Sequence, residues 1–202
     1  MQAPTRTAAP APTPDDLRLA LYYQRTGEFE LALVRYKRVL QVDELNVEAH
    51  NNLGILYQGK GLYEEAAREF QRVIAIDPRY LTAHLNLSAA YLKLGRPDAA
   101  STEARAVLAI DPRQSDALVN LALAQDAAGQ SGDALLTLRR ALELNPRHAA
   151  AHYNLGQHYE RSGEAALAID HYRQFLQLAG PDQTPYVADV RARVATLGRE
   201  NK

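Results

Sequence analysis

The stretch from Val47 to Tyr80, VEAHNNLGILYQGKGLYEEAAREFQRVIAIDPRY, decides the fold of this chain. Shifted by thirty-four residues in either direction, it aligns with the sequence found there. Three columns show the repeat most clearly: Leu19, Leu53, Leu87, Leu121 and Leu155; Gly27, Gly61, Gly95, Gly129 and Gly163; Ala32, Ala66, Ala100, Ala134 and Ala168. A period between about 20 and 50 residues is typical of solenoids and other repeat arrays. The period therefore predicts the architecture before any local pattern is considered.

Each unit has the pattern of two amphipathic helices. In the quoted unit the first helical face has residues at i, i+3, i+4 and i+7, which are His50, Leu53, Gly54 and Tyr57. The glycine that follows suits the left-handed conformation that ends many helices. The second face consists of Ala66, Phe70, Val73 and Ile74. Pro78 then closes the unit because proline cannot continue a helix. Neither helix can bury its face alone, so we expect each hairpin to pack on the next.

The columns of the unit are Leu-Gly-x-x-Tyr, then Gly, then Ala-x-x-x-Phe, then Pro. Their residues are Leu53, Gly54, Tyr57, Gly61, Ala66, Phe70 and Pro78. At this period they resemble the tetratricopeptide repeat family. The resemblance fills residues 15–182, with units by period at 13–46, 47–80, 81–114, 115–148 and 149–182. It implies an all-α fold, a right-handed α-solenoid of five antiparallel helix hairpins.

Two units depart from the pattern of large residues. Gln125 replaces the tyrosine of the fourth unit, and Ala104 replaces the aromatic residue of the third. Small residues let paired helices approach, and large ones fill the remaining space. We therefore expect the third and fourth units to be the softest part of the stack.

The segments outside the repeats are expected to differ in structure. Residues 1–14, MQAPTRTAAPAPTP, have the composition of an extended Pro/Ala-rich tail, or of a linker to another domain or a membrane anchor. Asp15 and Asp16 then begin the first helix, where acidic residues suit the helix dipole. After the repeats, Thr184 and Pro185 suit a helix start, and a capping helix is expected over 183–198, followed by a tail at 199–202.

The capping helix has an apolar stripe at helical spacing, which consists of Val187, Val190, Val194 and Leu197. A one-sided terminal helix of this kind covers the exposed core of the last repeat. Its polar residues Asp189, Arg191, Arg193 and Arg199 can then face water. The alternative is that these arginines form a docking face.

The composition excludes several classes of function. The 202 residues have a net charge of −1 and no cysteine, so disulfides, zinc–thiolate sites and a cysteine nucleophile are absent. A near-neutral chain lacks the basic stripe that nucleic acid requires. Neither a signal peptide nor a run long enough for a membrane span is visible. We expect a soluble chain, cytoplasmic by default, although no motif specifies a compartment.

The polar residues do not form a recognisable site for catalysis or a cofactor. His148 and His152 have the i, i+4 spacing of a helical zinc pair, but the first falls in a turn and no third ligand is evident. His50, His84 and His152 recur in one column, where packing against the neighbouring hairpin explains them better. No nucleophile, base and orienting group recur together. We therefore expect no enzyme activity, no metal and no cofactor.

One polar column stands out on the first helices. An asparagine directly precedes the repeated leucine in four units, at Asn52, Asn86, Asn120 and Asn154, and Arg18 has this position in the first unit. Consecutive helical residues differ by about 100° in direction, so this column should lie beside the core stripe on the concave face. The column resembles the asparagine ladder of the tetratricopeptide superhelices in O-linked N-acetylglucosamine transferases, which implies contact with a peptide backbone. The alternative is that each asparagine bonds to an adjacent helix and tightens the stack.

Apolar residues surround the asparagine column. They are Ile55, Leu85, Ala89, Val119, Leu123 and Tyr153. Together with the amides, they predict a concave groove that holds a peptide segment of a partner protein with micromolar affinity. These apolar residues could instead be covered by the chain's own tail or pack within the curve.

The predicted function is that of a non-catalytic protein–protein interaction scaffold. Two alternatives remain open. The array could recruit substrates for a larger enzyme or belong to a membrane-anchored protein. It could also be a self-associating assembly protein, whose arrays stack into a homo-oligomer.

Overall fold

The structure is a computed structural model that describes residues 15–180 and 184–200. The predicted tail at 1–14 and residues 201–202 of the predicted C-terminal tail lie outside the described residues, as do residues 181–183. The side chain of Thr184, the predicted start of the capping helix, also lies outside them.

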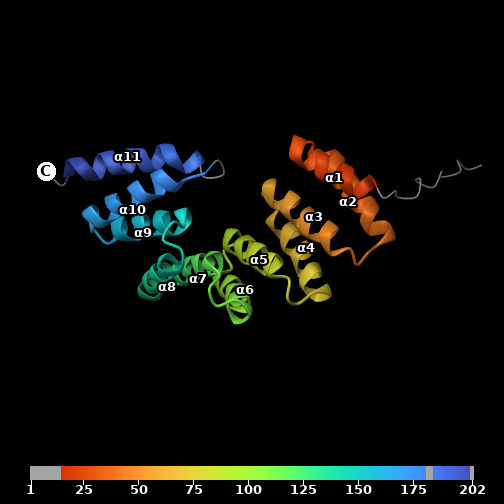
Figure 1. Ribbon diagram of the computed structural model, residues 1–202, viewed down its shortest axis with the longest axis horizontal. Coiled ribbons are helices and arrows are strands. Elements are labelled where there is room, and N and C mark those ends of the chain that lie inside the picture. Colours follow the sequence, from red (N-terminus) through yellow and green to blue (C-terminus); the bar gives the residue numbers. More distant parts are fainter. Residues whose placement is uncertain (1–14, 181–183, 201–202) are drawn as a thin grey trace, which may run out of the picture. The chain divides into compact units, whose positions relative to one another are not determined.

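The described residues form eleven helices and no strand (Figure 1). In chain order they are α1 (Asp15–Thr26), α2 (Phe29–Val42), α3 (Val47–Gly59), α4 (Tyr63–Ile76), α5 (Leu81–Lys93), α6 (Pro97–Ile110), α7 (Ser115–Ala127), α8 (Ser131–Leu144), α9 (Ala149–Arg161), α10 (Ala165–Leu178) and α11 (Thr184–Glu200). Helices α1 and α2, α3 and α4, α7 and α8, and α9 and α10 pack as pairs, and α11 packs on α10. The predicted all-α fold of consecutive hairpins with a helix after the last one is confirmed. None of the described helices is long and apolar enough to cross a bilayer.

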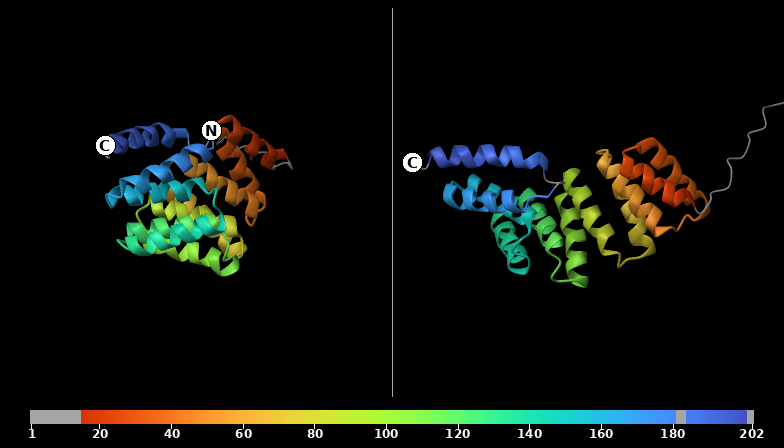
Figure 2. Two further views of the ribbon diagram at one scale, coloured as in Figure 1. Left: turned by 60° about the vertical axis from the view of Figure 1, so that its left-hand side comes forward. Right: turned by 45° about the horizontal axis from the view of Figure 1, so that its top comes forward.

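The chain divides into two compact units between Asn86 and Leu87, within α5. The first unit contains α1 to α4, and the second contains α6 to α11. Figure 2 shows the stacking of consecutive hairpins within each unit from two further directions. The division lies in the third repeat, one of the two in which the sequence lacks a large residue.

The repeated glycine ends the first helix of every hairpin. All five members of the column have a left-handed backbone, with φ of 79° at Gly27, 75° at Gly61, 68° at Gly95, 80° at Gly129 and 78° at Gly163. In the second repeat the N–H of the next residue, Leu62, donates to the carbonyl of Tyr57 at 3.0 Å. This bond satisfies a helix carbonyl that would otherwise lack a partner. The predicted role of the glycine column is therefore confirmed.

The paired small and large residues meet between the two helices of a hairpin. A Cβ atom added to Gly54 would lie 2.5 Å from Cε1 of Phe70, and one added to Gly156 would lie 2.4 Å from Cδ1 of Tyr172. Both rings are fully buried. Glycine is thus what allows an aromatic ring to lie directly on the first helix at these two positions.

In the third repeat the two helices of the hairpin contact each other without an aromatic ring. Ser88 has the glycine position, and Ala104 has the aromatic position. With no ring between the helices, the hydroxyl of Ser88 donates to the carbonyl oxygen of Ala100 at 2.8 Å. Both Ser88 and Ala104 are fully buried. A buried hydrogen bond therefore partly replaces aromatic packing in this hairpin.

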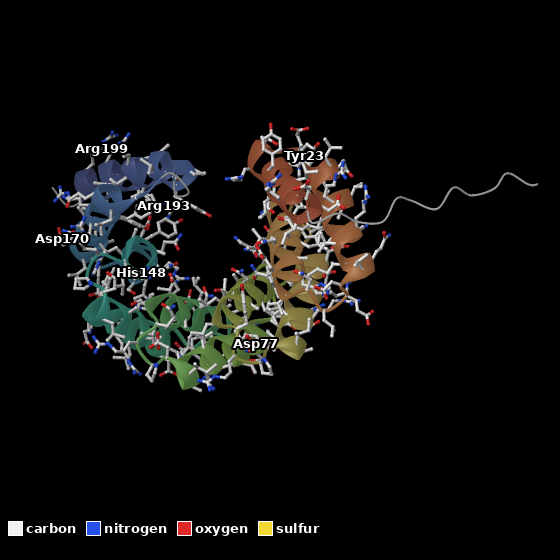
Figure 3. The ribbon with its side chains drawn as sticks, turned by 45° about the vertical axis from the view of Figure 1, so that its right-hand side comes forward. Tyr23, Asp77, His148, Asp170, Arg193 and Arg199 are labelled. Atoms are coloured by element: carbon white, nitrogen blue, oxygen red, sulfur yellow. The ribbon has the colours of Figure 1, made fainter. Side chains whose placement is uncertain are left out.

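Helix α11 covers the last hairpin. Val190 is fully buried, and Val187, Val194 and Leu197 pack against the core of the second unit. Arg193 points from α11 toward α9, where it donates to Glu160 at 2.9 Å, and it also donates to Asp189 at 2.7 Å (Figure 3). The sequence predicted that Arg193 can simply face water, whereas it is part of the contact that docks the helix.

Candidate functional site

The four asparagines of the predicted column lie on the first helices α3, α5, α7 and α9, and all are half-buried. Nδ2 of Asn154 donates to the carbonyl oxygen of Ala150, one turn back on its own helix, at 2.8 Å. Asn120 also interacts within the chain. The side chains of Asn52 and Asn86 make no hydrogen bond with the described residues. The column therefore contains both engaged and unengaged amides.

Within the first unit, Arg18 lies on α1, and Asn52 and Ile55 lie on α3, a helix that contacts α1. Arg18 pairs with Asp15 at 2.9 Å on the surface, where the two side chains are 82% and 60% exposed. Such an exposed ion pair stabilises little and breaks easily. Ile55 is 37% exposed, one turn beyond Asn52 on the same helix. The two neighbouring helices thus present an amide, an aliphatic side chain and an exposed guanidinium.

The apolar residues of the second unit differ in how much surface they offer. Val119 is buried in the core at 5% exposure, so it leaves little for a partner to contact. Tyr153 is half-buried, with its ring centroid 5.2 Å from Phe175 and 5.3 Å from Tyr186 of α11. Its hydroxyl accepts a hydrogen bond from Gln157 at 2.9 Å, and burial raises its pKa. Helix α11 therefore covers part of this predicted contact.

The other members of the apolar set, Leu85 and Ala89, are half-buried on α5. Leu123 and Asn154 are brought together in the second unit, where both line a small hollow of about 40 Å³. We call it the fourth-repeat hollow; its lining is Ala122, Leu123, Asp126, Ala134, Leu138, Asn154, Gln157, His158 and Arg161.

The sequence did not single out the polar rim of this hollow. Arg161 of the fifth repeat donates to Asp126 of the fourth at 2.7 Å. Ser131 donates to the other oxygen of the same carboxylate at 2.9 Å. Gln157 lies almost one turn after Asn154 on α9. Its position on the helix, three residues beyond the asparagine column, is the signal that could have identified it.

The i, i+4 spacing of His148 and His152, which resembles that of a helical zinc pair, has a structural explanation. Nδ1 of His148 caps α9 by accepting from the N–H of Ala151 at 3.3 Å, so Nε2 carries the proton and donates to Asp116 at 3.0 Å. This hydrogen bond lowers the pKa of Asp116. Among the residues described by the structure, no three His, Cys, Asp or Glu side chains are grouped to hold a metal ion.

The histidines His50, His84 and His152 are part of a buried polar column that was not predicted from the sequence. It also includes Asp16 of the first hairpin. In three hairpins a residue of the first helix contacts the residue nineteen positions later on the second: Asp16 with Arg35 at 2.8 Å, His50 with Glu69 at 2.6 Å, and His152 with His171 at 2.9 Å. The Nε2 atoms of His50, His84 and His152 bond to the carbonyl oxygens of Glu44, Pro78 and Pro146. His50 and His152 therefore link the two helices of their own hairpin. All three histidines also bond to the end of the preceding repeat, so the predicted contact with a neighbouring hairpin is present as well.

The tautomers of His152 and His171 follow from these contacts. Nε2 of His152 lies 3.1 Å from the carbonyl of Pro146, which can only accept, so Nε2 carries the proton and Nδ1 accepts. Nδ1 of His171 must then donate across the 2.9 Å contact. A second proton would place two N–H groups against each other. The pKa of His171 is lowered by burial first, and also by His152 and Arg139, against the opposite effect of Asp170.

We expect the fifth hairpin to lose stability in mild acid. A lowered histidine pKa means that the folded state binds fewer protons than the unfolded chain, so stability is complete above the unfolded pKa of about 6.5 and falls as the pH drops below it. The protection factors of the α9 and α10 amides, which correct for the pH dependence of the intrinsic exchange rate, should therefore fall between about pH 7.5 and about pH 5.5.

The control is His171→Glu, which gives His152 the same kind of partner that His50 has in Glu69. A carboxylate at this position can accept a second N–H from the facing ring, so the protection factors in α9 and α10 should not fall in acid. An equal fall of the protection factors in both proteins would mean that the histidine pair is not its cause.

Comparisons with known proteins agree with the repeat. Models of the tetratricopeptide repeat match residues 119–183 and 58–125, and a model of the TPR repeat matches residues 21–61. No curated protein matches the chain.

Several solved structures share the fold. The thermophilic TPR protein TTC0263 of Thermus thermophilus has a TM-score of 0.72 and 24% identity, covering 91% of this chain and 97% of that one. MamA 41-end from Desulfovibrio magneticus RS-1 has a TM-score of 0.71 and 24% identity, with 81% and 92% covered. YrrB, described as a TPR protein with an unusual peptide-binding site, has a TM-score of 0.63 and 21% identity, with 81% and 84% covered. Because the family models follow one another along the repeated sequence and the hairpins have its 34-residue period, this chain belongs to the tetratricopeptide repeat family.

Proposed function

We propose that the chain is a non-catalytic scaffold that binds an extended peptide segment of a partner protein on its first helices. Within each unit, the amides of the asparagine column hold the peptide backbone, and the neighbouring apolar side chains contact its side chains. In the first unit these are Arg18, Asn52, Ile55 and Asn86, and in the second they are mainly Leu123 and Asn154.

The observation that carries this proposal is the state of Asn52 and Asn86. Both amides are half-buried, and neither makes a hydrogen bond with the described residues. Asparagine is also a poor residue for the interior of a helix. An amide offers a donor and an acceptor, so it can pair with the N–H and C=O of a peptide of any sequence. A stacking role alone would leave these two side chains without a purpose.

Asn154 has a more limited role in the same proposal. Its Nδ2 is already bonded to Ala150, so only Oδ1 remains to accept from a peptide N–H. The fold is similar to that of YrrB, a TPR protein with an unusual peptide-binding site, and this supports peptide binding as the general class of function. Binding by several such amides, each contributing about 0.5–1.5 kcal/mol, is consistent with micromolar affinity.

A peptide library displayed on phage supplies the ligand for the test. A selected peptide is synthesised with a fluorophore, and its Kd is measured by anisotropy. Asn52→Ala and Asn86→Ala should each raise the Kd about 2- to 13-fold, which corresponds to the loss of one net hydrogen bond. Asn154→Ala should have a smaller effect, because half of its amide is engaged within α9.

The control variants are Gln41→Ala, Gln174→Ala and Gln177→Ala, which remove exposed amides from the second helices α2 and α10. They should leave the Kd unchanged. If the asparagine variants bind as the glutamine variants do but melt at a clearly lower temperature, the column has a stacking role and the proposal is wrong. Light scattering at two concentrations shows whether self-association, the alternative function, competes with peptide binding.

A further inference from the structure

The fourth repeat lacks a ring that three other repeats have. At the large position of the second helix the chain has Tyr36, Phe70 and Tyr172 in the first, second and fifth repeats, but Leu138 in the fourth. All three rings are fully buried. Leu138 is buried too, at 4% exposure, but its side chain is shorter than a ring.

The tyrosines show how far a ring reaches at this position. The hydroxyl of Tyr36 donates to Oε1 of Gln24 at 2.6 Å, and the hydroxyl of Tyr172 donates to Glu160. Gln24 and Glu160 occupy the same place near the end of the first helix in their repeats. The ring therefore spans the hairpin from the second helix to the first.

The second repeat supports this comparison. Phe70 has the ring but no hydroxyl, and the equivalent residue on the first helix is Gln58. Its Oε1 is buried and has no hydrogen-bond partner. The polar side chain at this position of the first helix therefore lies beside the end of the ring. It has a hydrogen-bond partner when the ring is a tyrosine and lacks one when the ring is a phenylalanine.

In the fourth repeat the equivalent residue is Asp126. Leu138 and Asp126 both line the fourth-repeat hollow, so the hollow lies where a ring would otherwise extend. The carboxylate does not require a ligand, because Arg161 and Ser131 already bond to its two oxygens. What remains to be filled is the apolar space bounded by Ala122, Leu123 and the leucine itself.

The size of the hollow limits what can enter. It measures about 40 Å³, whereas an apolar cavity known to hold a benzene ring measures about 150 Å³. One or two methyl groups fit, and an aromatic side chain does not. Asn154 lies on the lining with Oδ1 unused, so a backbone N–H beside the entering side chain would have an acceptor.

We propose that the fourth-repeat hollow is a subsite for one small aliphatic side chain, of alanine to valine size, from the bound peptide. The proposal rests on the peptide-binding function proposed above, and it adds a sequence preference that the backbone contacts of the asparagines do not provide. Each methylene buried there should improve the Kd about fourfold.

The test uses a selected peptide that binds the wild-type protein. Every position of the peptide is replaced in turn by Gly, Ala, Val, Leu and Phe. One position should favour Val over Gly and reject Phe. Leu138→Phe places a ring in the hollow, so at that position the preference for Val over Gly should disappear and the Kd of the Val peptide should rise to that of the Gly peptide.

The fold should accept this substitution, because Ala20 faces Tyr36 in the first repeat just as Ala122 would face the new ring. The matched control is Leu136→Phe on the same helix, where the side chain is 64% exposed and lies outside the hollow. It should retain the wild-type preference. Leu138→Val, which enlarges the hollow, should shift the preference toward leucine.

The outcomes separate the two proposals. If the wild-type protein selects no peptide, the proposed function fails and the subsite with it. If peptides bind and the asparagine variants weaken them, but no position prefers a small aliphatic residue or Leu138→Phe leaves the preference intact, only the subsite is wrong.

Discussion

Replacing Gly156 by alanine is expected to destabilise the second unit by about 1–3 kcal/mol, the usual cost of overpacking a filled core. The new Cβ would lie 2.4 Å from Cδ1 and 2.5 Å from Cε1 of Tyr172. That ring cannot move away freely, because it is fully buried and its hydroxyl is bonded to Glu160. Urea unfolding followed by circular dichroism gives the change in the free energy of unfolding.

The control for this prediction is Gly132→Ala in helix α8, where an added Cβ meets nothing within 4 Å. Removing an exposed helical glycine should be neutral or stabilise by up to about 1 kcal/mol. If Gly156→Ala is equally harmless, the fifth repeat accepts an alanine opposite a ring as the first repeat does with Ala20 and Tyr36, and the close contact has no energetic consequence.

A second comparison identifies the ring as the cause. The fourth repeat pairs Ala122 with Leu138, so alanine is compatible with leucine at these two positions. In a Tyr172→Leu background, Gly156→Ala should therefore cost much less than it does opposite the tyrosine. The difference between the two costs is the coupling energy of the pair. A coupling near zero would contradict the overpacking explanation.

The fold could be predicted because its structural roles recur in the sequence at a fixed period, the left-handed glycine in all five repeats and a large residue opposite a small one in four. The left-handed glycine and the pairing of small with large residues were recognised as columns, and the structure confirms both at Gly61 and at Gly54 with Phe70. A single copy of either feature would have been ambiguous, since glycine and phenylalanine have many roles. Repetition at a fixed period removes that ambiguity.

The candidate site could be predicted only in part. The sequence places the asparagines on one face of the first helices, but it does not show that Nδ2 of Asn154 turns back to Ala150. That choice depends on side-chain rotation, which leaves no periodic signal. The fourth-repeat hollow was missed for a related reason. Leu138 belongs to the same column as the aromatic residues, and only the reach of the tyrosines shows what space a leucine leaves empty.

The buried polar column did have a signal in the sequence. Residues nineteen positions apart change together between hairpins, from Asp16 and Arg35 in the first to His50 and Glu69 in the second, and the fourth has the uncharged pair Leu118 and Thr137. Neither column shows the pairing by itself, because each position alone varies between charged, polar and apolar residues.

Asp16→Ala is expected to destabilise the first unit by about 2–4 kcal/mol, because breaking a buried ion pair leaves its partners uncompensated. Asp16 is fully buried, with Oδ1 2.8 Å from Nη1 of Arg35 and Oδ2 3.7 Å from Nε of Arg38. The sequence predicted only a helix-dipole role for this residue, which would contribute about 0.3–1 kcal/mol. The measured cost therefore distinguishes the two roles.

The neighbouring residue supplies a matched control. Asp15 also lies in the first turn of α1, but its partner Arg18 is 82% exposed, so Asp15→Ala should cost well under about 1 kcal/mol. The double variant Asp16→Leu with Arg35→Thr copies the pair found in the fourth repeat, and a buried ion pair replaced by well-packed uncharged residues is often neutral. It should thus recover much of the stability that Asp16→Ala loses. If Asp15→Ala and Asp16→Ala cost the same, the ion pair with Arg35 stabilises nothing beyond the helix dipole, and the buried column is tolerated by the hairpin without contributing to its stability.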